Sequence, residues 1–443
     1  MDQLVEQHTS NSNQKQQSQA IVTDQAEKIL DLAIELLHII FSDYQGRAAI
    51  RLWYHNAVIG DDKADCTLVF NKDYPLRELI LHRDLGRLTE AYLCGDVEVE
   101  GDMEKLFDLV DYLQDGKLSL YQRARIFLLA VRLPKRKGRR VNQALNTGTQ
   151  RDENIKESIA HHYDISNDFY RLWLDPEMNY SCAYFSHPEQ TLADAQRDKL
   201  DYICRKLRLS PGQKLLDIGC GWGGLALWAS RKYGVRVHGI TLSKEQYHYD
   251  VEKAKALRLD DRVRFELRDY RELPEQEHYD RIVSVGMFEH IGVRNFLTYF
   301  SIIKRLLAPG GLFLNHGITN DTGWQPTTIT RFINDYIFPD GELARISDVI
   351  DMMEKAGLEI LDVEALRPHY VMTLRHWIKS LNENRKQVVK ASSEYIFKLW
   401  RLYMAGSAYY FDQGSTGIYQ ILACNMRQPW MLPLRRDDLY LNT

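Results

Sequence analysis

A glycine-rich segment after an apolar run, LLDIGCGWGGLA (residues 215–226), is the first place where the sequence could bind a cofactor. Gly219, Gly221 and Gly224 fit the G-x-G-x-x-G pattern, which lets a loop between a strand and a helix approach a nucleotide closely. Asp217 ends the apolar run, and a carboxylate there can fix the loop and meet a cationic or amino-bearing ligand. The next apolar run ends in GITLS, with no acid to hold a ribose as dinucleotide enzymes do. The pattern indicates a nucleotide-like cofactor, and the glycines alone leave a dinucleotide dehydrogenase as an alternative.

Four further side chains stand where catalytic or binding groups are often found. Cys182 lies between aromatic residues in MNYSCAYFS, where a nucleophile, a metal ligand, a core residue and a backbone contact to a ligand are all open. Glu289 and His290 are adjacent in FEHIG, so their side chains are expected to point apart, and Glu289 is favoured as the functional one. His316 follows an apolar run, so it is either a functional residue at the end of a strand or a hydrogen-bonded structural histidine. Tyr370 in RPHYVMTL either contributes to a site or simply packs near the start of a helix.

The cysteines and histidines show no metal-binding pattern. No C-x-x-C pair occurs, and the adjacent His161 and His162 lack further ligands at a suitable spacing, so we predict no metal site. The spacing of the cysteines is not that of a disulfide-bonded domain, so the thiols are expected to be free, as in a reducing compartment. The cysteines are Cys66, Cys94, Cys182, Cys204, Cys220 and Cys424.

Strand-length apolar runs alternate with amphipathic stretches after residue 190. This alternation is typical of an α/β fold with a parallel sheet covered on both faces, and ligands bind such sheets at the carboxyl ends of the strands. The predicted strands are KLLDIG (214–219), VRVHGITL (235–242), VRFELR (263–268), YDRIVSVG (279–286) and GLFLNHGI (311–318).

The chain is expected to divide at a polar linker. Residues 1–22 are polar and are expected to be disordered. Residues 23–116 show helical and strand patterns that predict a small α/β module. Residues 117–153 predict a basic helix followed by a linker, with the boundary near 141–153. Residues 154–443 contain the glycine-rich segment and form the predicted catalytic domain.

The charge balance argues against a nucleic-acid partner, since the formal net charge of the 443 residues is −4. Residues 117–140 are the exception, with nine Lys and Arg and no acidic residue. They form either a core helix with a solvated basic linker or an anchor for anionic lipid, and composition leaves both open. No apolar run approaches the roughly 20 residues that span a bilayer, and the first residues show no signal pattern. A cytoplasmic protein, or one on a membrane surface, is expected.

Several segments together resemble one enzyme family. LLDIGCGWGG, TLSKEQ (241–246), SVGMFEHIG (284–292) and HYDISNDFYRLWLDPEMNYSCAYF resemble cyclopropane-fatty-acyl-phospholipid synthases. These enzymes belong to the cyclopropane fatty acid and mycolic acid synthase family of class I S-adenosylmethionine-dependent methyltransferases. The likeness runs from about Asn154 to Cys424, and LTEAYLCGDVEVEGDMEKLFDLV resembles the extra N-terminal module of the longer bacterial synthases. The resemblance implies a Rossmann-like, mostly parallel seven-stranded sheet with helices on both faces, plus a smaller, lipid-associated α/β N-terminal domain.

The reaction that the resemblance implies adds a methylene group to a lipid. The methyl group of S-adenosylmethionine passes to the cis double bond of an unsaturated phospholipid acyl chain, and loss of a proton from the carbocation closes a cyclopropane ring. In the family a bound bicarbonate removes that proton. An anion in an apolar pocket is costly unless hydrogen-bond donors reach its oxygens and an acceptor meets its hydroxyl group. The matching catalytic positions are the backbone amide of Cys182, Glu289, His316, the backbone of Ile318, and Tyr370.

The resemblance also implies the cofactor contacts and their surroundings. Ring faces around Tyr163, Phe169, Tyr170 and Trp173 would stabilise a carbocation. Ser407 stands where many family members are expected to have a cysteine. The implied S-adenosylmethionine contacts are Tyr180, Ser181, Asp217, Gly219, Gly221, Gly223, Thr241, Leu242, Ser243, Gln246, Asp269 and Tyr270.

The implied partner is the inner surface of a phospholipid membrane with unsaturated acyl chains, met by a cytoplasmic protein. The resemblance is compatible with a homodimer and implies no nucleic acid. Two alternatives keep the cofactor and change the product to a methyl-branched lipid or a methylated amine. A non-catalytic lipid carrier is a further alternative, against which the complete set of catalytic positions argues.

Overall fold

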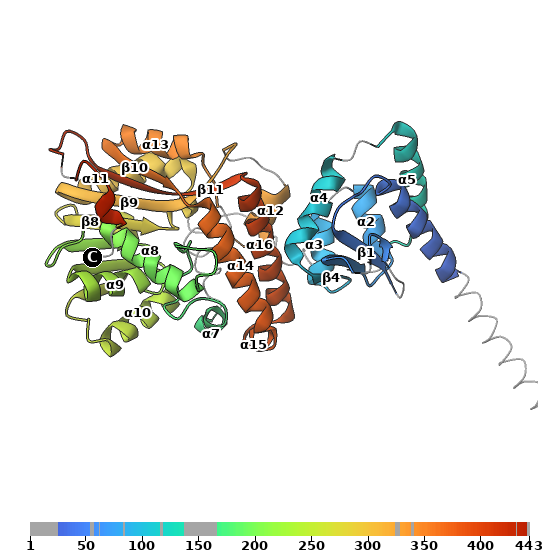
Figure 1. Cartoon of the computed structure of the whole chain (residues 1–443), viewed down its shortest axis with the longest axis horizontal. Helices are drawn as coiled ribbons and strands as arrows, with labels where there is room; N and C mark the ends of the chain where they lie inside the picture. The colour runs from blue at the N-terminus through green and yellow to red at the C-terminus, as the bar shows by residue number, and fades with distance from the viewer. Residues whose placement is uncertain are drawn as a thin grey trace, which may run out of the picture. The chain divides into compact units, whose positions relative to one another are not determined.

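The chain forms two compact units, residues 1–148 and 149–443, which are coloured from blue to teal and from green to red in Figure 1. The predicted disordered terminus, the linker at 141–153, His161, His162 and Tyr163 lie outside the described residues. The structure, a computed structural model, describes residues 25–53, 57–61, 63–82, 85–115, 118–136, 166–323, 328–337, 341–430 and 432–440.

The N-terminal unit combines a sheet with helices. The described strands pair in the order β2-β1-β3-β4, with β1 parallel to β3 and the other pairs antiparallel. The predicted basic helix is α5, which packs against α2 inside this unit. Its elements are a helix over 25–40, β1 (Ala48–Leu52), β2 (Ala57–Ile59), β3 (Cys66–Phe70), α2 (Tyr74–His82), α3 (Leu85–Leu93), β4 (Val97–Gly101), η1 (Met103–Lys105), α4 (Leu106–Asp115) and α5 (Leu120–Arg132).

The second unit alternates strands and helices, as the sequence predicts. Its first half contains α7 (Asn167–Arg171), α8 (Leu192–Lys206), β5 (Lys214–Ile218), α9 (Gly224–Tyr233), β6 (Arg236–Thr241), α10 (Lys244–Ala256), β7 (Val263–Leu267), η3 (Tyr270–Glu272) and β8 (Tyr279–Val285). Its second half contains η4 (Phe288–His290), η5 (Val293–Asn295), α11 (Phe296–Leu306), β9 (Leu307–Asn320), α12 (Thr328–Tyr336), α13 (Ile346–Lys355), β10 (Leu358–Ala365), α14 (Arg367–Glu383), α15 (Arg385–Ala391), α16 (Glu394–Gln413), β11 (Thr416–Asn425) and η6 (Asp437–Leu439).

The sheet of this unit has seven strands in the order β10-β11-β9-β8-β5-β6-β7. The strands from β9 to β7 are parallel, and β11 runs antiparallel to both of its neighbours. The predicted mostly parallel, seven-stranded α/β fold is therefore confirmed. Apolar periodicity located five of the strands, and β10 and β11 complete the sheet.

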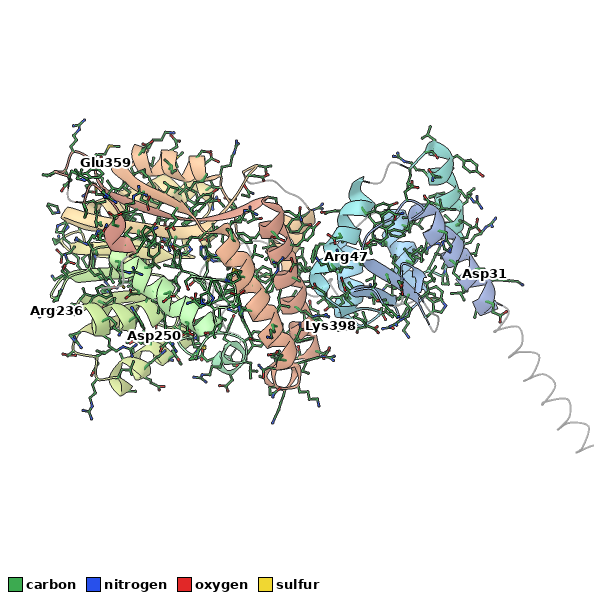
Figure 2. The ribbon with its side chains drawn as sticks, viewed as in Figure 1. Asp31, Arg47, Arg236, Asp250, Glu359 and Lys398 are labelled. Carbon is green, nitrogen blue, oxygen red and sulfur yellow. The ribbon has the colours of Figure 1, made fainter. Side chains whose placement is uncertain are left out.

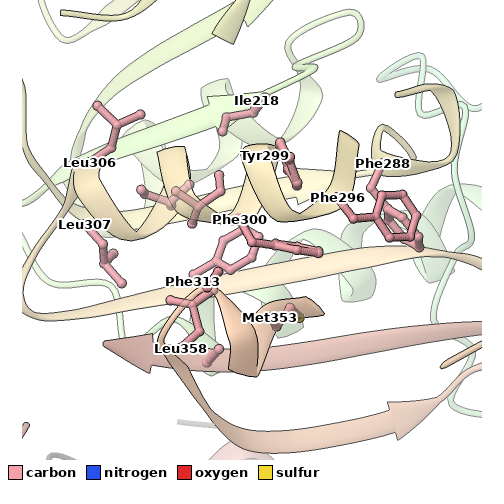
Figure 3. Packing of buried hydrophobic residues seen from close by; sticks show 14 of the residues in the cluster. Ile218, Phe288, Phe296, Tyr299, Phe300, Leu306, Leu307, Phe313, Met353 and Leu358 are labelled. Carbon is pink, nitrogen blue, oxygen red and sulfur yellow. The ribbon is translucent and has the colours of Figure 1, made fainter. Parts of the chain in front are cut away.

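Side chains alternate between the two faces of the sheet and build a core on each. Along β9, Leu312 and Leu314 pack with α8, α9 and α10, whereas Phe313 packs with α11 and α13. The second core is rich in aromatic rings, with the Phe300 and Phe313 centroids 6.4 Å apart (Figure 3). Two covered faces leave the carboxyl ends of the strands as the open edge for a ligand. None of the helices in the described ranges has the length and apolar character to cross a bilayer.

Candidate active site

A pocket opens at the carboxyl ends of β5, β6, β7 and β8, where the sequence predicts ligand binding. The segment before α8 closes one side of it. Gly223 and Ser243 do not line the pocket but belong to loops that do. The predicted cofactor contacts that line it are Tyr180, Ser181, Asp217, Gly219, Gly221, Thr241, Leu242, Gln246, Asp269 and Tyr270.

The loop after β5 requires glycine because its backbone is left-handed and closely packed. Gly219, Gly221 and Gly223 have φ angles of 77°, 58° and 70°. A Cβ on Gly223 would lie 2.9 Å from the Phe265 ring, so the loop could not keep its position. Beneath the loop lies Asp250 of α10, which is fully buried and is labelled in Figure 2. Phe265 and Asp250 therefore leave no room for a side chain at Gly223.

Asp217 presents a buried carboxylate to the pocket. Among the described residues, no donor reaches its Oδ2 atom, and burial raises its pKa to about 7. An ionised carboxylate in this position needs a cationic or hydrogen-bonding partner. The ammonium group of an amino-acid moiety is one group that could supply that partner.

Lys199 of α8 lines the same pocket and is missing from the sequence prediction. Its buried Nζ donates to Ser181 Oγ at 3.0 Å and lies 3.4 Å from Asn179 Oδ1, and burial lowers its pKa to about 8. A signal was present in the sequence, since Lys199 falls four residues after Ala195 on the buried stripe of α8. A lysine on such a stripe requires a polar environment.

The end of β6 is tied together by side-chain hydrogen bonds. Thr241 Oγ1 donates to Gln246 Oε1 at 2.7 Å, and the Ser243 amide donates to Thr241 Oγ1 at 3.2 Å. Ser243 Oγ in turn accepts from the Gln246 amide at 3.3 Å and caps α10. These bonds orient the Gln246 side chain, which lines the pocket. In dinucleotide-binding enzymes an acidic residue near the end of the second strand binds the ribose, and Gln246 is a polar group close to that place.

The carboxylate of Asp269 is held by a neighbouring guanidinium. It accepts from the Arg271 amide at 2.9 Å, from Arg271 Nε at 3.0 Å and from a terminal nitrogen of Arg271 at 2.7 Å. Arg268 and Arg271 also line the pocket and were not predicted. The available signal was their place at the carboxyl end of a predicted strand, since Arg268 directly follows β7 and Arg271 lies in η3 just beyond it.

Glu289 lies at the carboxyl end of β8 but outside the lining of this pocket, whereas His290 lines it. The two neighbouring side chains therefore point to different places, as predicted. Glu289 Oε1 accepts from the Ile318 amide at 2.6 Å, and no described residue donates to Oε2. Burial raises the Glu289 pKa to about 7. The Ile318 amide thus holds the Glu289 carboxylate in place.

His316 is buried on β9, and one of its two ring nitrogens contacts a neighbouring side chain. Its Nδ1 lies 3.4 Å from Nε2 of Gln420, a contact that suits a neutral ring with its proton on Nε2. No partner for that Nε2 occurs among the described residues. Burial, together with the charges of Lys199 and Lys206, lowers the His316 pKa to about 3, so the ring stays neutral.

A short series of contacts connects the predicted catalytic residues across β11. Ile318 is paired with Ile418, whose carbonyl accepts from the Leu366 amide at 2.9 Å. The Leu366 carbonyl accepts from the Tyr370 amide at 3.2 Å and lies 3.9 Å from Cys182 Sγ. These contacts link Ile318 on β9, through β11 and Leu366, to Tyr370 and Cys182.

The buried thiol of Cys182 has no feature of a nucleophile. It is fully buried, burial raises its pKa, and its Sγ donates to the Ala183 carbonyl at 3.2 Å. We expect Cys182→Ala to retain turnover within about tenfold, at a stability cost of about 1 kcal/mol for the lost sulfur. Steady-state kinetics and thermal unfolding measure both effects, and complete loss of turnover in a folded variant would contradict the backbone role.

An aromatic cluster packs beside these residues. The Tyr180 ring centroid lies 5.3 Å from that of Trp377 and 5.8 Å from that of Trp400, and the predicted Phe169, Tyr170 and Trp173 belong to the same cluster. We call this buried, π-rich cluster the aromatic wall, and it reaches the lining of the pocket at Tyr180.

Tyr403 of α16 was missed by the sequence analysis. It is hydrogen-bonded to Tyr180 and Ser407, and burial raises its pKa to about 12. Ser407, the departure noted in the sequence, therefore contacts the aromatic wall through Tyr403.

Comparison with known proteins identifies the family. Residues 150–421 match the family model described as mycolic acid cyclopropane synthetase. The chain belongs to this family. It is 38% identical to a probable fatty acid methyltransferase from Pseudomonas putida over 88% of this chain and 95% of that protein. The structure of the cyclopropane synthase MmaA2 from Mycobacterium tuberculosis shares 34% identity with a TM-score of 0.58, covering 63% of this chain and 99% of the other.

A second solved structure of the family contains a cofactor product. It is mycolic acid cyclopropane synthase CmaA1 complexed with SAH and CTAB, at 37% identity, a TM-score of 0.57, and coverage of 60% of this chain and 97% of that one. This chain is accordingly an S-adenosylmethionine-dependent methyltransferase of the cyclopropane synthase family, which acts on lipid acyl chains.

Proposed function

We propose that this protein transfers a methylene group from S-adenosylmethionine to the cis double bond of unsaturated phospholipid acyl chains and forms cyclopropane rings. The observation that carries the proposal is a pair of buried atoms, Glu289 Oε2 and His316 Nε2, for which no partner occurs among the described residues. An alkene attacks the sulfonium methyl without a base, but ring closure requires removal of a proton where water is excluded.

These residues fit a small oxyanion such as bicarbonate, which supplies a base of suitable strength when bound. His316 Nε2 donates, Glu289 accepts a hydroxyl hydrogen, and the Tyr370 hydroxyl and the Cys182 amide are further proposed contacts. Ile318 acts through Glu289, because its amide holds that carboxylate. Buried polar atoms without partners are costly, which favours a ligand that satisfies them.

The cofactor contacts in this proposal are those of the pocket. Asp217 meets the ammonium group, the loop of Gly219 and Gly221 approaches the cofactor, and Gln246 contacts its ribose. The aromatic wall faces the acyl chain and stabilises positive charge. The lipid lies in a membrane that a cytoplasmic protein reaches from its inner face, with the N-terminal unit associated with lipid.

The test is to incubate the purified full-length protein with methyl-labelled S-adenosylmethionine and vesicles of monounsaturated phospholipid. Mass spectrometry of the acyl chains is expected to show addition of CH2 with loss of the alkene. Label in a methyl branch would keep the cofactor site and refute ring closure. No label in the lipid, despite tight cofactor binding, would refute the phospholipid substrate.

Cofactor affinity is expected to rise with pH through about 7. Below the Asp217 pKa of about 7 the carboxyl group is protonated, so binding an ammonium group must first remove that proton. Between pH 6 and pH 8 the ionised fraction grows about tenfold, and the affinity for S-adenosylhomocysteine should follow. Calorimetric titration in Asp217→Asn should show weaker binding without this rise. A variant that keeps the same pH dependence would exclude Asp217 as its source.

A further inference from the structure

Helix α5 of the N-terminal unit is apolar on two opposite sides. One side packs inward through Ile126, Leu129 and Ala130. The other side exposes large apolar side chains, and Leu120, Phe127 and Val131 recur on it at helical spacing. The exposed fractions are 84% for Leu120, 73% for Tyr121, 58% for Phe127, 62% for Leu128 and 47% for Val131.

The inner side and both ends of α5 are firmly held. Ser119 and Gln122 form a capping box at the start of the helix. At its end the buried guanidinium of Arg77 donates to the carbonyls of Ala130 at 2.9 Å, Val131 at 2.6 Å and Leu133 at 3.0 Å. The outer apolar side is therefore presented by a rigid helix, and α5 does not need it in order to pack on α2.

Basic side chains flank the exposed stripe. Arg123 lies beyond one edge, and Arg125 and Arg132 lie beyond the other. Arg125 is paired with Glu35, whereas no carboxylate in the described part of the chain pairs with Arg123, Arg132 or Lys135. Residues 117–140 contain no acid at all. Apolar side chains between unneutralised cations are complementary to an anionic lipid surface.

A second copy of the chain fits this face poorly. A two-fold contact through α5 would bring the arginines of both copies together with no acidic residue on the helix to neutralise them. We propose that the outer face of α5, formed by Leu120, Tyr121, Phe127, Leu128 and Val131 with Arg123 and Arg132, docks on the anionic surface of a phospholipid bilayer. This inference deepens the proposed function and rests on it, since a membrane-borne acyl chain is the reason to dock.

Flotation of the full-length protein with vesicles tests this docking without any turnover. On vesicles containing phosphatidylglycerol, the double variant Leu120→Gln/Phe127→Gln is expected to lose at least about tenfold in partition coefficient, because two exposed apolar side chains no longer enter the lipid. Arg123→Gln/Arg132→Gln should lose on the order of tenfold on these vesicles and little on pure phosphatidylcholine.

Leu297→Gln on α11 is the matched control, because Leu297 is 46% exposed on a helix of the other unit and should keep wild-type partition. Affinity for S-adenosylhomocysteine should stay unchanged in all α5 variants, which verifies that the catalytic unit is intact, and wild-type thermal unfolding and circular dichroism should verify that the N-terminal unit is folded. Unchanged partition of the apolar double variant, or conversion of a dimer to a monomer by it with vesicle binding intact, would overturn the proposal. Absence of a cyclopropane product with vesicle binding as expected would refute the proposed function alone.

Discussion

Glu289→Gln is expected to lower kcat by about 10²- to 10³-fold, within the range found for removal of a group that serves proton transfer. The amide keeps the oxygen that accepts from Ile318 at 2.6 Å, so the backbone of β9 should stay in place. The substitution replaces Oε2, for which the described part of the chain supplies no donor, by an NH2 group, which cannot accept a hydroxyl hydrogen. The loss should therefore appear in the chemical step.

The affinity for S-adenosylhomocysteine should change by less than about threefold, because Glu289 is outside the lining of the cofactor pocket. Single-turnover product formation and calorimetric titration separate the two effects. Glu342→Gln is the matched control, since its Oε2 also accepts from a backbone amide, that of Val293 at 2.8 Å. A Glu289→Gln variant with wild-type kcat, or equal losses in both variants, would refute the special role of Glu289.

Much of the catalytic unit was predictable because its local signals agree with its tertiary structure. The run KLLDIG forms β5, and the glycines after it have the positive φ angles that only glycine adopts easily. Parallel strands bury both faces, so their apolar runs are continuous and easy to recognise. Cofactor residues that directly follow such strands, including Asp217 and Thr241, could therefore be placed at one edge.

The residues that the sequence did not reveal depend on tertiary contacts. Lys199 and Tyr403 lie on helices whose patterns indicate core packing, and only the fold brings them to the pocket and the aromatic wall. The backbone of Ile318 was expected to contact an anion, and the bond from its amide to Glu289 depends on the path of η4 over β9. Likewise, β11 is antiparallel and far along the chain from β9, so periodicity alone gave no reason to pair them.

Gly317→Ala should impair both stability and turnover, because this glycine makes room for the segment that carries Glu289. A Cβ at residue 317 would lie 2.0 Å from Phe288 Cε1 and 2.9 Å from Glu289 Oε1. Phe288 is buried and has little space to move, so the free energy of unfolding should fall by about 1–3 kcal/mol. Displacement of η4 would also break the bond from the Ile318 amide, and turnover should fall about 100-fold for the same reason as in Glu289→Gln.

Chemical denaturation and product formation measure the two losses, and a second substitution tests their cause. Phe288→Leu removes part of the ring that the new methyl group would meet, so its destabilisation and that of Gly317→Ala should not add. The double variant should be more stable than the sum predicts by about 1 kcal/mol, the usual size of coupling between residues in contact. Turnover should recover only partly, because the added Cβ still crowds Glu289 Oε1. Additive losses, or a Gly317→Ala variant with wild-type turnover, would mean that the tight packing of β9 against η4 does not position the carboxylate.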